Sequence, residues 1–268
     1  MILNVGSARI DYEIVGEGTP VLMLHGFPLD REIMKGCMEP IFDSRDGYSR
    51  IYLDLPGMGK SPSPEGNWTS DDMLGAVIFL IHELLPERRV ILVGESYGAY
   101  LARGLVNKLF DRIAGICMIC PLIIPQDELR DLPQAERDPV PYNQLSSEEE
   151  RISSFAQTFD KNVGERYRLE VEEALARADE DFVEDLRNNG YPLGFDPDEL
   201  EKPFSAPSLF ICGRQDRIVG YRDAWAIIDR YPRATFALID GAGHYLQVER
   251  EDAFRSLLHE WLDRLESI

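Results

Sequence analysis

The sequence predicts an α/β fold, with a mostly parallel central sheet flanked by helices and a helical insertion late in the chain. Two observations lead to this fold class. Short apolar runs that end in glycine or proline turns alternate with longer segments of helical periodicity. The alternation stops between residues 122 and 202, where no convincing strand occurs. With 268 residues, 44% of them hydrophobic, the chain has enough apolar side chains for a sizeable core.

The expected strands are short runs that share one form. The first two, ILNV at 2–5 and ARIDYEIV at 8–15, are separated by Gly6 and Ser7 and predict an N-terminal hairpin. The later runs are apolar almost throughout, which is typical of strands that helices cover on both faces. These runs are TPVLMLHG (19–26), SRIYLDLPG (49–57), RRVILVGES (88–96), GICMICPL (115–122), APSLFICG (206–213) and ATFALIDG (234–241).

The segments between these strands carry apolar residues at helical spacing. The clearest is 251–265, where six apolar residues recur at helical intervals, namely Phe254, Leu257, Leu258, Trp261, Leu262 and Leu265. Such a stripe predicts a helix packed against the sheet. The other helices expected in the sheet region are 70–85, 98–110 and 220–231.

Residues 122–202 are expected to form a separate helical layer. The segment starts with a proline-rich stretch, and Ser147 with Glu150 then makes a capping-box pattern at the start of a helix. The expected organisation is a core of residues 1–121 and 203–268 with a helical cap of residues 122–202. The helices expected in the cap are 148–160, 163–178 and 180–189.

The overall charge argues against two classes of partner. The chain has 48 acidic and 28 basic residues, for a formal net charge of −20. Nucleic acids and anionic membranes are bound by clustered Lys and Arg, so neither partner is expected. The N-terminal stretch has neither a basic start nor a long apolar run, so the expected compartment is the cytoplasm.

The four cysteines are expected to be structural. Three of them lie in strongly apolar stretches, where a thiol behaves as a small hydrophobic group. Cys117 and Cys120 form a C-x-x-C pair, but positions i and i+3 of a strand point to opposite faces. A shared metal or a disulfide is therefore not expected between them.

The stretch GESYG contains the candidate nucleophile. Gly94, Ser96 and Gly98 form a G-x-S-x-G pattern, with an expected strand before it and an expected helix after it. Flanking glycines allow a sharp turn that exposes the serine oxygen above the strand ends. Taken alone, the pattern also fits a serine that only caps the following helix, so the partners of Ser96 must decide between the two interpretations.

A serine nucleophile needs a base, and the base needs an acid. Asp216 follows one expected strand end and His244 follows the next, in the chain order Ser, Asp, His. Asp240 is the rival acid, but it lies on the same strand exit as His244. Because the three groups of a Ser-His-Asp catalytic triad come from separate strand ends, Asp216 is the preferred acid.

An acyl-transfer intermediate also needs two backbone N–H donors for its oxyanion. The expected donors are Tyr97, directly after the nucleophile, and Phe27, in the turn HGF after an early strand. His25 in the same turn is a second candidate base. Its position before Gly26 suits a hydrogen bond that braces the turn.

Together these sequence motifs identify the chain as similar to members of the α/β-hydrolase superfamily, in the branch with a helical cap. The resemblance covers nearly the full length and rests on HGFP, DLPGMGKS, GESYGA, GRQD and GAGH in the family's order. It implies that the D-x-P-G-x-G-x-S turn is structural. The GKS ending of that turn also suggests a phosphate-binding loop, but Asp54 stands where such a loop has its first glycine.

The resemblance implies a serine hydrolase without a metal or organic cofactor, and the expected substrate is a small or medium carboxylic ester. Hydrolysis of amide, lactone, thioester or carbon–carbon bonds stays open, as does a triad-bearing receptor or signalling partner with little turnover. Ser96 argues against haloalkane dehalogenases and epoxide hydrolases, which usually carry Asp at the nucleophile position. Glu95 stands where many relatives have His, which leaves substrate choice open. The oligomeric state is not predicted.

Overall fold

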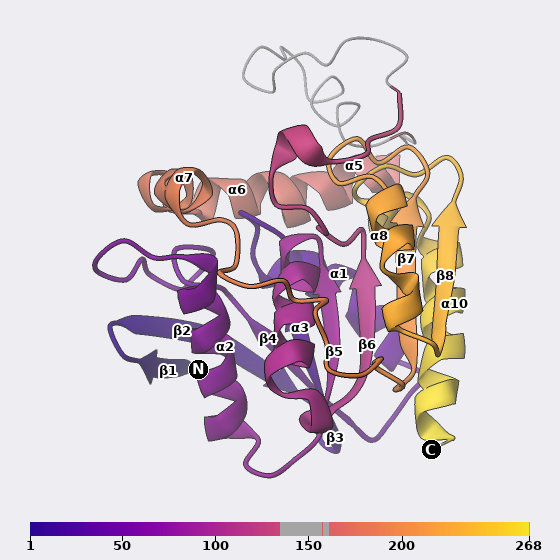
Figure 1. The fold of residues 1–268 in the computed structure, drawn as a ribbon, viewed down its shortest axis with the longest axis horizontal. Helices are drawn as coiled ribbons and strands as arrows, with labels where there is room; N and C mark the ends of the chain where they lie inside the picture. The colour runs from indigo at the N-terminus through magenta and orange to yellow at the C-terminus, as the bar shows by residue number, and fades with distance from the viewer. Residues whose placement is uncertain (135–156, 158–160, 268) are drawn as a thin grey trace.

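The computed structural model of this protein describes residues 1–134, 157 and 161–267. Its central sheet has eight strands in the order β1-β2-β4-β3-β5-β6-β7-β8 (Figure 1). The β1–β2 and β2–β4 pairs are antiparallel, and every other pair is parallel. The expected fold class is therefore confirmed. The strands are β1 (Ile2–Val5), β2 (Ala8–Val15), β3 (Thr19–Leu24), β4 (Tyr48–Leu53), β5 (Val90–Glu95), β6 (Ile113–Ile119), β7 (Ser208–Gly213) and β8 (Ala234–Ile239).

Burial along the strands follows their place in the sheet. Every residue of β5 and β7 is buried, whereas every residue of the edge strand β8 is only half-buried. Interior strands of a parallel sheet are covered on both faces, which is why their sequences are continuously apolar. The N-terminal hairpin turns at Gly6 and Ser7, as expected, with Val5 paired to Ala8.

Helices cover both faces of the sheet. The helices α1 and α10 pack together on one face, and α2 and α3 pack together on the opposite face (Figure 1). In α10, four residues of the predicted stripe are buried, Phe254, Leu258, Trp261 and Leu262, and the other two, Leu257 and Leu265, are partly buried against the core. Among the described residues, no helix combines the length and apolarity needed to cross a bilayer. The bounds are α1 (Arg31–Phe42), α2 (Ser70–Leu84), α3 (Tyr97–Lys108), α9 (Leu246–Glu249) and α10 (Glu251–Glu266).

The helix expected at 220–231 is shorter and divided. α8 spans Arg222–Ala226, and a 3-10 turn, η5, spans Ile228–Arg230. Between them Ile227 leaves α-helical geometry, with φ −97° and ψ 0°. The tighter turn leaves the Arg230 carbonyl free to accept a hydrogen bond from the Phe204 amide, 2.8 Å away, and this long-range bond replaces a continued helix.

The chain between β6 and β7 supplies a helical layer at one end of the sheet. Its described helices are α5 (Lys161–Tyr167), a π-helical turn η4 (Arg168–Glu172), α6 (Glu173–Arg177) and α7 (Glu180–Asn189). In Figure 1 this layer lies beyond the carboxyl ends of the parallel strands. The helix expected at 148–160 and its capping box lie outside the described residues.

All four cysteines are buried and free of disulfides. Burial raises the pKa of Cys117 and of Cys120 well above the usual thiol value, so both stay protonated at neutral pH. They therefore behave as small apolar groups of the core, as expected.

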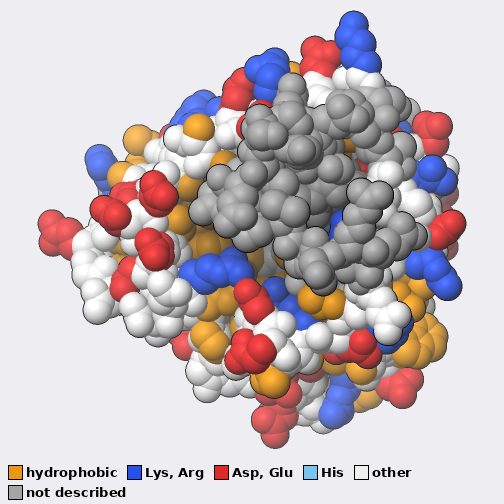
Figure 2. All heavy atoms as spheres, turned by 90° about the horizontal axis from the view of Figure 1, so that it is seen from above, with side chains coloured by type: hydrophobic (Ala, Val, Ile, Leu, Met, Phe, Trp, Pro, Cys, Tyr) orange, Lys and Arg blue, Asp and Glu red, His pale blue; other side chains and the backbone are white. Residues whose placement is uncertain are grey.

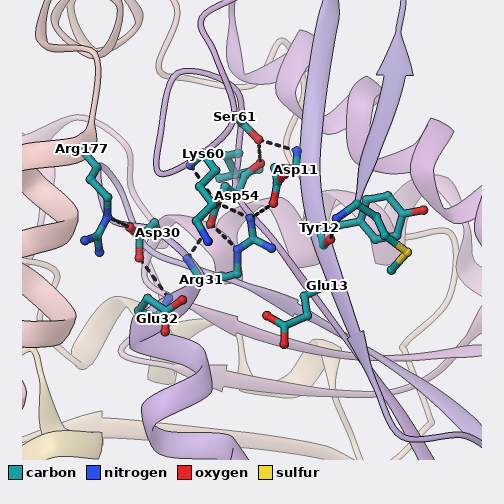
Figure 3. Close-up of polar contacts among 12 residues, drawn as sticks. Asp11, Tyr12, Glu13, Asp30, Arg31, Glu32, Asp54, Lys60, Ser61 and Arg177 are labelled. Atoms are coloured by element: carbon teal, nitrogen blue, oxygen red, sulfur yellow. Dashed lines mark hydrogen bonds and ion pairs between the residues drawn. The ribbon is translucent and has the colours of Figure 1, made fainter.

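The DLPGMGKS turn is held by a buried carboxylate. Asp54 accepts hydrogen bonds from the backbone amide and the guanidinium of Arg31, and from the Lys60 amide at 2.8 Å (Figure 3). The Ser61 hydroxyl donates to the Asp54 carbonyl at 2.6 Å and accepts from the Asp11 amide at 2.8 Å. The turn thus uses its polar groups internally and does not present them to a phosphate.

We predict that Asp54→Ala destabilises the protein. The side chains of Arg31 and Asp54 are only 4% and 2% exposed, so the substitution leaves a buried cation with one fewer partner. Removing one partner of a buried pair costs about 3 to 5 kcal/mol. Urea unfolding followed by tryptophan fluorescence measures the change.

The matched control is Asp111→Ala, whose carboxylate is 93% exposed and lies 4.0 Å from Lys202. We expect it to change the free energy of unfolding by less than about 0.5 kcal/mol. Equal effects of the two substitutions would contradict the structural role of Asp54.

Candidate active site

Ser96 lies in a strained turn between β5 and α3. Its backbone has φ 51° and ψ −111°, a region that residues with a side chain rarely adopt. Its side chain makes no hydrogen bond to the first turn of α3, so the interpretation as a side-chain helix cap does not apply. The hydroxyl points instead to a histidine from another loop.

The two glycines that flank Ser96 are required by close backbone approach. A Cβ on Gly98 would overlap the Leu24 carbonyl at the end of β3, and a Cβ on Gly94 would lie 2.6 Å from the Ala99 amide nitrogen. Real Cβ atoms essentially never come this close to backbone atoms. The glycines therefore allow β3, β5 and the start of α3 to pack against one another at the turn.

The structure brings Ser96, His244 and Asp216 together from three loops. His244 Nε2 lies 3.0 Å from Ser96 Oγ, and His244 Nδ1 lies 2.8 Å from Asp216 Oδ2. The other carboxylate oxygen of Asp216, Oδ1, accepts hydrogen bonds from the backbone amides of Ile218 and Val219 at 2.8 and 3.1 Å. All three side chains belong to buried residues. The result is a continuous hydrogen-bond chain from the hydroxyl to an anchored carboxylate.

Asp240, the rival acid, lies apart from this chain of hydrogen bonds. Its side chain is 83% exposed, and it accepts a hydrogen bond from the Gln215 amide group at 2.9 Å. Gln215 also accepts from the backbone amides of Gly241 and Ala242, which joins the loop of Asp216 to the loop of His244. The acid beside His244 is therefore Asp216.

The electrostatics of His244 favour its protonation. Burial lowers the pKa of His244, but the charge of Asp216, its hydrogen bond and the charge of Glu95 outweigh burial and raise it above the usual value. Asp216 stabilises the imidazolium and orients the ring, which a histidine base requires.

Phe27 and Tyr97, the expected oxyanion donors, lie side by side. Their rings meet edge to face with centroids 5.4 Å apart, and Tyr191 stacks on Tyr97 at 5.1 Å. Within the described part of the chain, neither backbone amide donates a hydrogen bond. Neither N–H group is therefore engaged by another group of the described chain.

His25 braces the turn that carries Phe27. Its Nε2 accepts from the Leu55 amide at 2.9 Å, so Nδ1 carries the proton and donates to the Gly26 carbonyl at 2.9 Å. Burial is the largest influence on this side chain and lowers its pKa. A neutral, doubly hydrogen-bonded imidazole has no free nitrogen for catalysis.

Arg130 ties the start of the insertion to the loop of Asp216. Its guanidinium donates to the carbonyls of Ile124, Pro125 and Ile218 at 2.8 to 3.0 Å, and it pairs with Asp127 at 2.6 Å.

Figure 2 shows the surface at the end of the molecule where the insertion lies. Acidic and basic side chains are interspersed over the visible atoms of this surface.

The aromatic residues of the insertion divide between the site and the core. Tyr191 contacts Phe27 and Tyr97, and Tyr167 packs on Tyr245 beside His244. Phe182 packs against Gly57, and Phe195 lines a separate cleft of about 550 Å³ that contains none of the three hydrogen-bonded residues. Three further aromatic residues of the insertion, Tyr142, Phe155 and Phe159, lie outside the described residues.

One group of possible metal-ligating atoms occurs among the described residues, namely those of Cys120, Asp216 and His244, which lie within 4.8 Å of one another. Burial raises the pKa of Cys120 well above its usual value, which opposes the thiolate that a metal needs. The other two members are already bonded to each other. This arrangement fits the hydrogen-bond chain better than a metal centre.

Comparison with known proteins places the chain among hydrolases. The sequence model described as "Alpha/beta hydrolase family" matches residues 21–257. A 2-hydroxy-6-oxononadienedioate/2-hydroxy-6-oxononatrienedioate hydrolase of Paraburkholderia phymatum is 28% identical over 81% of this chain and 77% of the relative. A 2-hydroxy-6-oxo-6-(2'-aminophenyl)hexa-2,4-dienoic acid hydrolase of Metapseudomonas resinovorans is 23% identical over 98% of this chain and 90% of the relative.

Solved structures give the same result. An alpha/beta superfamily hydrolase from Oenococcus oeni is 30% identical, covers 99% of both chains and superposes with a TM-score of 0.85. A thermophilic esterase from Thermogutta terrifontis is 25% identical, with a TM-score of 0.71 over 96% of this chain and 94% of that chain.

The close packing at the turn predicts that Gly98→Ala is destabilising. The added Cβ must displace the Leu24 carbonyl, and such overpacking costs about 1 to 3 kcal/mol. The control is Gly75→Ala in α2, where a Cβ meets nothing within 4 Å. That substitution is expected to stabilise by up to about 1 kcal/mol because alanine favours helix. Urea unfolding of both variants tests the contrast, and two changes of the same sign would contradict it.

Proposed function

This chain belongs to the alpha/beta hydrolase family, and on that premise we propose that it is a serine hydrolase with Ser96 as nucleophile, His244 as base and Asp216 as acid. One observation carries the proposal, the hydrogen-bond chain in which His244 lies 3.0 Å from Ser96 and 2.8 Å from Asp216. These distances are within the range that proton transfer requires.

In the proposed mechanism, Ser96 Oγ attacks the substrate carbonyl while His244 Nε2 takes its proton. The developing oxyanion accepts hydrogen bonds from the backbone amides of Phe27 and Tyr97. Collapse of the intermediate expels the alcohol, which takes the proton from His244, and leaves an acyl group on Ser96. Water, deprotonated by His244, then releases the acid and restores the serine.

The proposed substrate is a small or medium carboxylic ester. An ester needs only the nucleophile, base and oxyanion donors that these residues can supply, because its alcohol leaves after accepting one proton. The similarity to an esterase at 25% identity supports this choice.

We also infer that residues 122–202 form a cap over a core of residues 1–121 and 203–268. The segment leaves after β6 and returns before β7, close to the loops that carry Ser96 and Asp216. The packing of Tyr191 against Phe27 and Tyr97 supports the inference. A cap of this kind excludes water and limits substrate length.

Hydrolysis of a carbon–carbon bond is the second candidate, favoured by the names of the curated relatives. A 2-hydroxy-6-oxo dienoic acid contains no ester, so its hydrolysis breaks a bond between carbons beside the ketone. The same attack by Ser96 would serve, but a carbon must then be protonated and a substrate carboxylate must be bound. Among the described residues, Arg130 is a cation whose charge acts on His244, and it is already engaged by three carbonyls and Asp127. We therefore place the ester first.

The test is labelling with a fluorophosphonate together with two substrate classes, p-nitrophenyl esters of increasing acyl length and a 2-hydroxy-6-oxo dienoic acid. Ser96→Ala is expected to abolish labelling and to lower kcat by about 10⁴ to 10⁶. A higher kcat/KM on the dienoic acid would favour the second candidate. Labelling without turnover of either class would favour a ligand-binding role, and labelling that survives Ser96→Ala would refute the proposal.

The choice of acid gives a second prediction. Asp216→Asn leaves His244 in the wrong tautomer and is expected to lower kcat by about 10⁴ on the preferred ester. Asp240→Asn removes an exposed carboxylate and is expected to change kcat less than about threefold, because exposed charges are strongly screened. Steady-state kinetics of folded, purified variants decides between the two acids, and the reverse ranking would assign the role to Asp240.

A further inference from the structure

Glu95, the last residue of β5, is a buried carboxylate that the mechanism above does not use. Its residue is 1% exposed, and neither oxygen of its side chain has a hydrogen-bond partner among the described residues. Burial of a carboxylate without hydrogen bonds is costly, and nearly all buried polar groups have a hydrogen-bond partner. Such a side chain requires a physical explanation.

The carboxylate lies against two parts of the active site. Its Oε1 is 3.6 Å from His244 Nε2, the nitrogen that also faces Ser96. On its other side it packs on Gly26, where a Cβ would overlap Oε2. Glu95 thus fills the space between the imidazole and the loop that carries Phe27.

The surroundings allow Glu95 to hold a proton near neutral pH. Burial, with the charge of Asp216, raises the pKa of Glu95 to about 7, although the charge of His244 and the nearby Gly26 amide act in the opposite direction. The Gly26 amide lowers the pKa of Glu95 from close by, although it makes no hydrogen bond of normal geometry to either carboxylate oxygen. The charge of Glu95 in turn helps to raise the pKa of His244 above its usual value, so each group acts on the other.

Among the described residues, two thiols, Arg130 and Asp216 are the other titratable groups that act on this pair. The thiols of Cys37 on α1 and Cys120 after β6 have a pKa raised by burial and stay neutral. The guanidinium of Arg130 acts on His244 from a position that is fixed by its hydrogen bonds to backbone carbonyls. Asp216 is held by the amides of Ile218 and Val219.

We propose that Glu95 is a positioning residue that shares one proton with His244. With the proton on Glu95, His244 is the neutral base that Ser96 requires. With the proton on His244, the imidazolium lies between two carboxylates, Asp216 at Nδ1 and Glu95 near Nε2. Groups coupled in this way lose protons as a pair, so the acidic limb of the activity profile belongs to both residues. This inference rests on the proposed function, because it concerns the same site.

The first test follows His244 by NMR of ring-labelled histidine in the resting protein, with the signal assigned by its loss in His244→Asn. Glu95→Gln keeps the shape of the side chain and removes its charge, so the imidazolium loses one stabilising carboxylate. The titration midpoint of His244 is expected to move to lower pH, and the acidic limb of kcat/KM is expected to move with it. Glu95→Asp, which retains a carboxylate, should give an intermediate midpoint.

The matched control is Asp240→Asn, which removes an exposed carboxylate from the same loop region and should leave the His244 midpoint unchanged. An unchanged midpoint in folded Glu95→Gln, or an equal shift in the control, would overturn the proposal.

A second measurement needs no variant. The side-chain carbon of Glu95 in the wild-type protein, labelled with ¹³C, should titrate with a midpoint of about 7, and an ordinary midpoint near 4.5 would also overturn the proposal. Neither NMR titration depends on turnover. A protein that hydrolyses no substrate but shows both titrations would contradict the proposed function and leave proton sharing intact.

Discussion

The turn at Ser96 is the constraint on which the site depends. A chain that passes from β5 into α3 within one residue must adopt a positive φ, which costs about 1 to 3 kcal/mol for a residue with a side chain. The cost is offset because the turn is held on both sides. The Ser96 amide donates to the Ile119 carbonyl at 2.9 Å, and the Ser96 carbonyl accepts from the amides of Ala99, Tyr100 and Leu122. Gly94 and Gly98 leave room for the Ala99 amide and the Leu24 carbonyl, respectively.

The parallel sheet explains how distant residues meet at this turn. Strands β3, β5, β7 and β8 run in the same direction, so the loops after their carboxyl ends emerge at one edge. Those loops carry Phe27, Ser96, Asp216 and His244. Gln215 and Arg130 then join neighbouring loops by hydrogen bonds to backbone groups, which holds the side chains at fixed distances.

Two carboxylates beside one imidazole have opposite environments. Asp216 accepts three hydrogen bonds, whereas Glu95 accepts none among the described residues, and its burial raises the pKa of its carboxyl group. Environments that separate the acidities of two similar groups are how active sites assign different roles to them. The acidic surface of the chain has no part in this difference, because solvent screens exposed charges.

The sequence by itself determined the alternation of strands and helices, the glycine turn at Ser96 and the positions of Asp216 and His244 after separate strands, because these features depend on local spacing and on the direction of parallel strands. The choice of Asp216 over Asp240 as the neighbour of His244 followed from the same reasoning. Only the tertiary structure decided that Glu95 lies 3.6 Å from His244, that Asp240 is exposed, and that the helix expected at 220–231 divides at Ile227. Each of these depends on which segments approach one another in space, and one-dimensional spacing does not encode which loop residues meet or whether a side chain finds a hydrogen-bond partner.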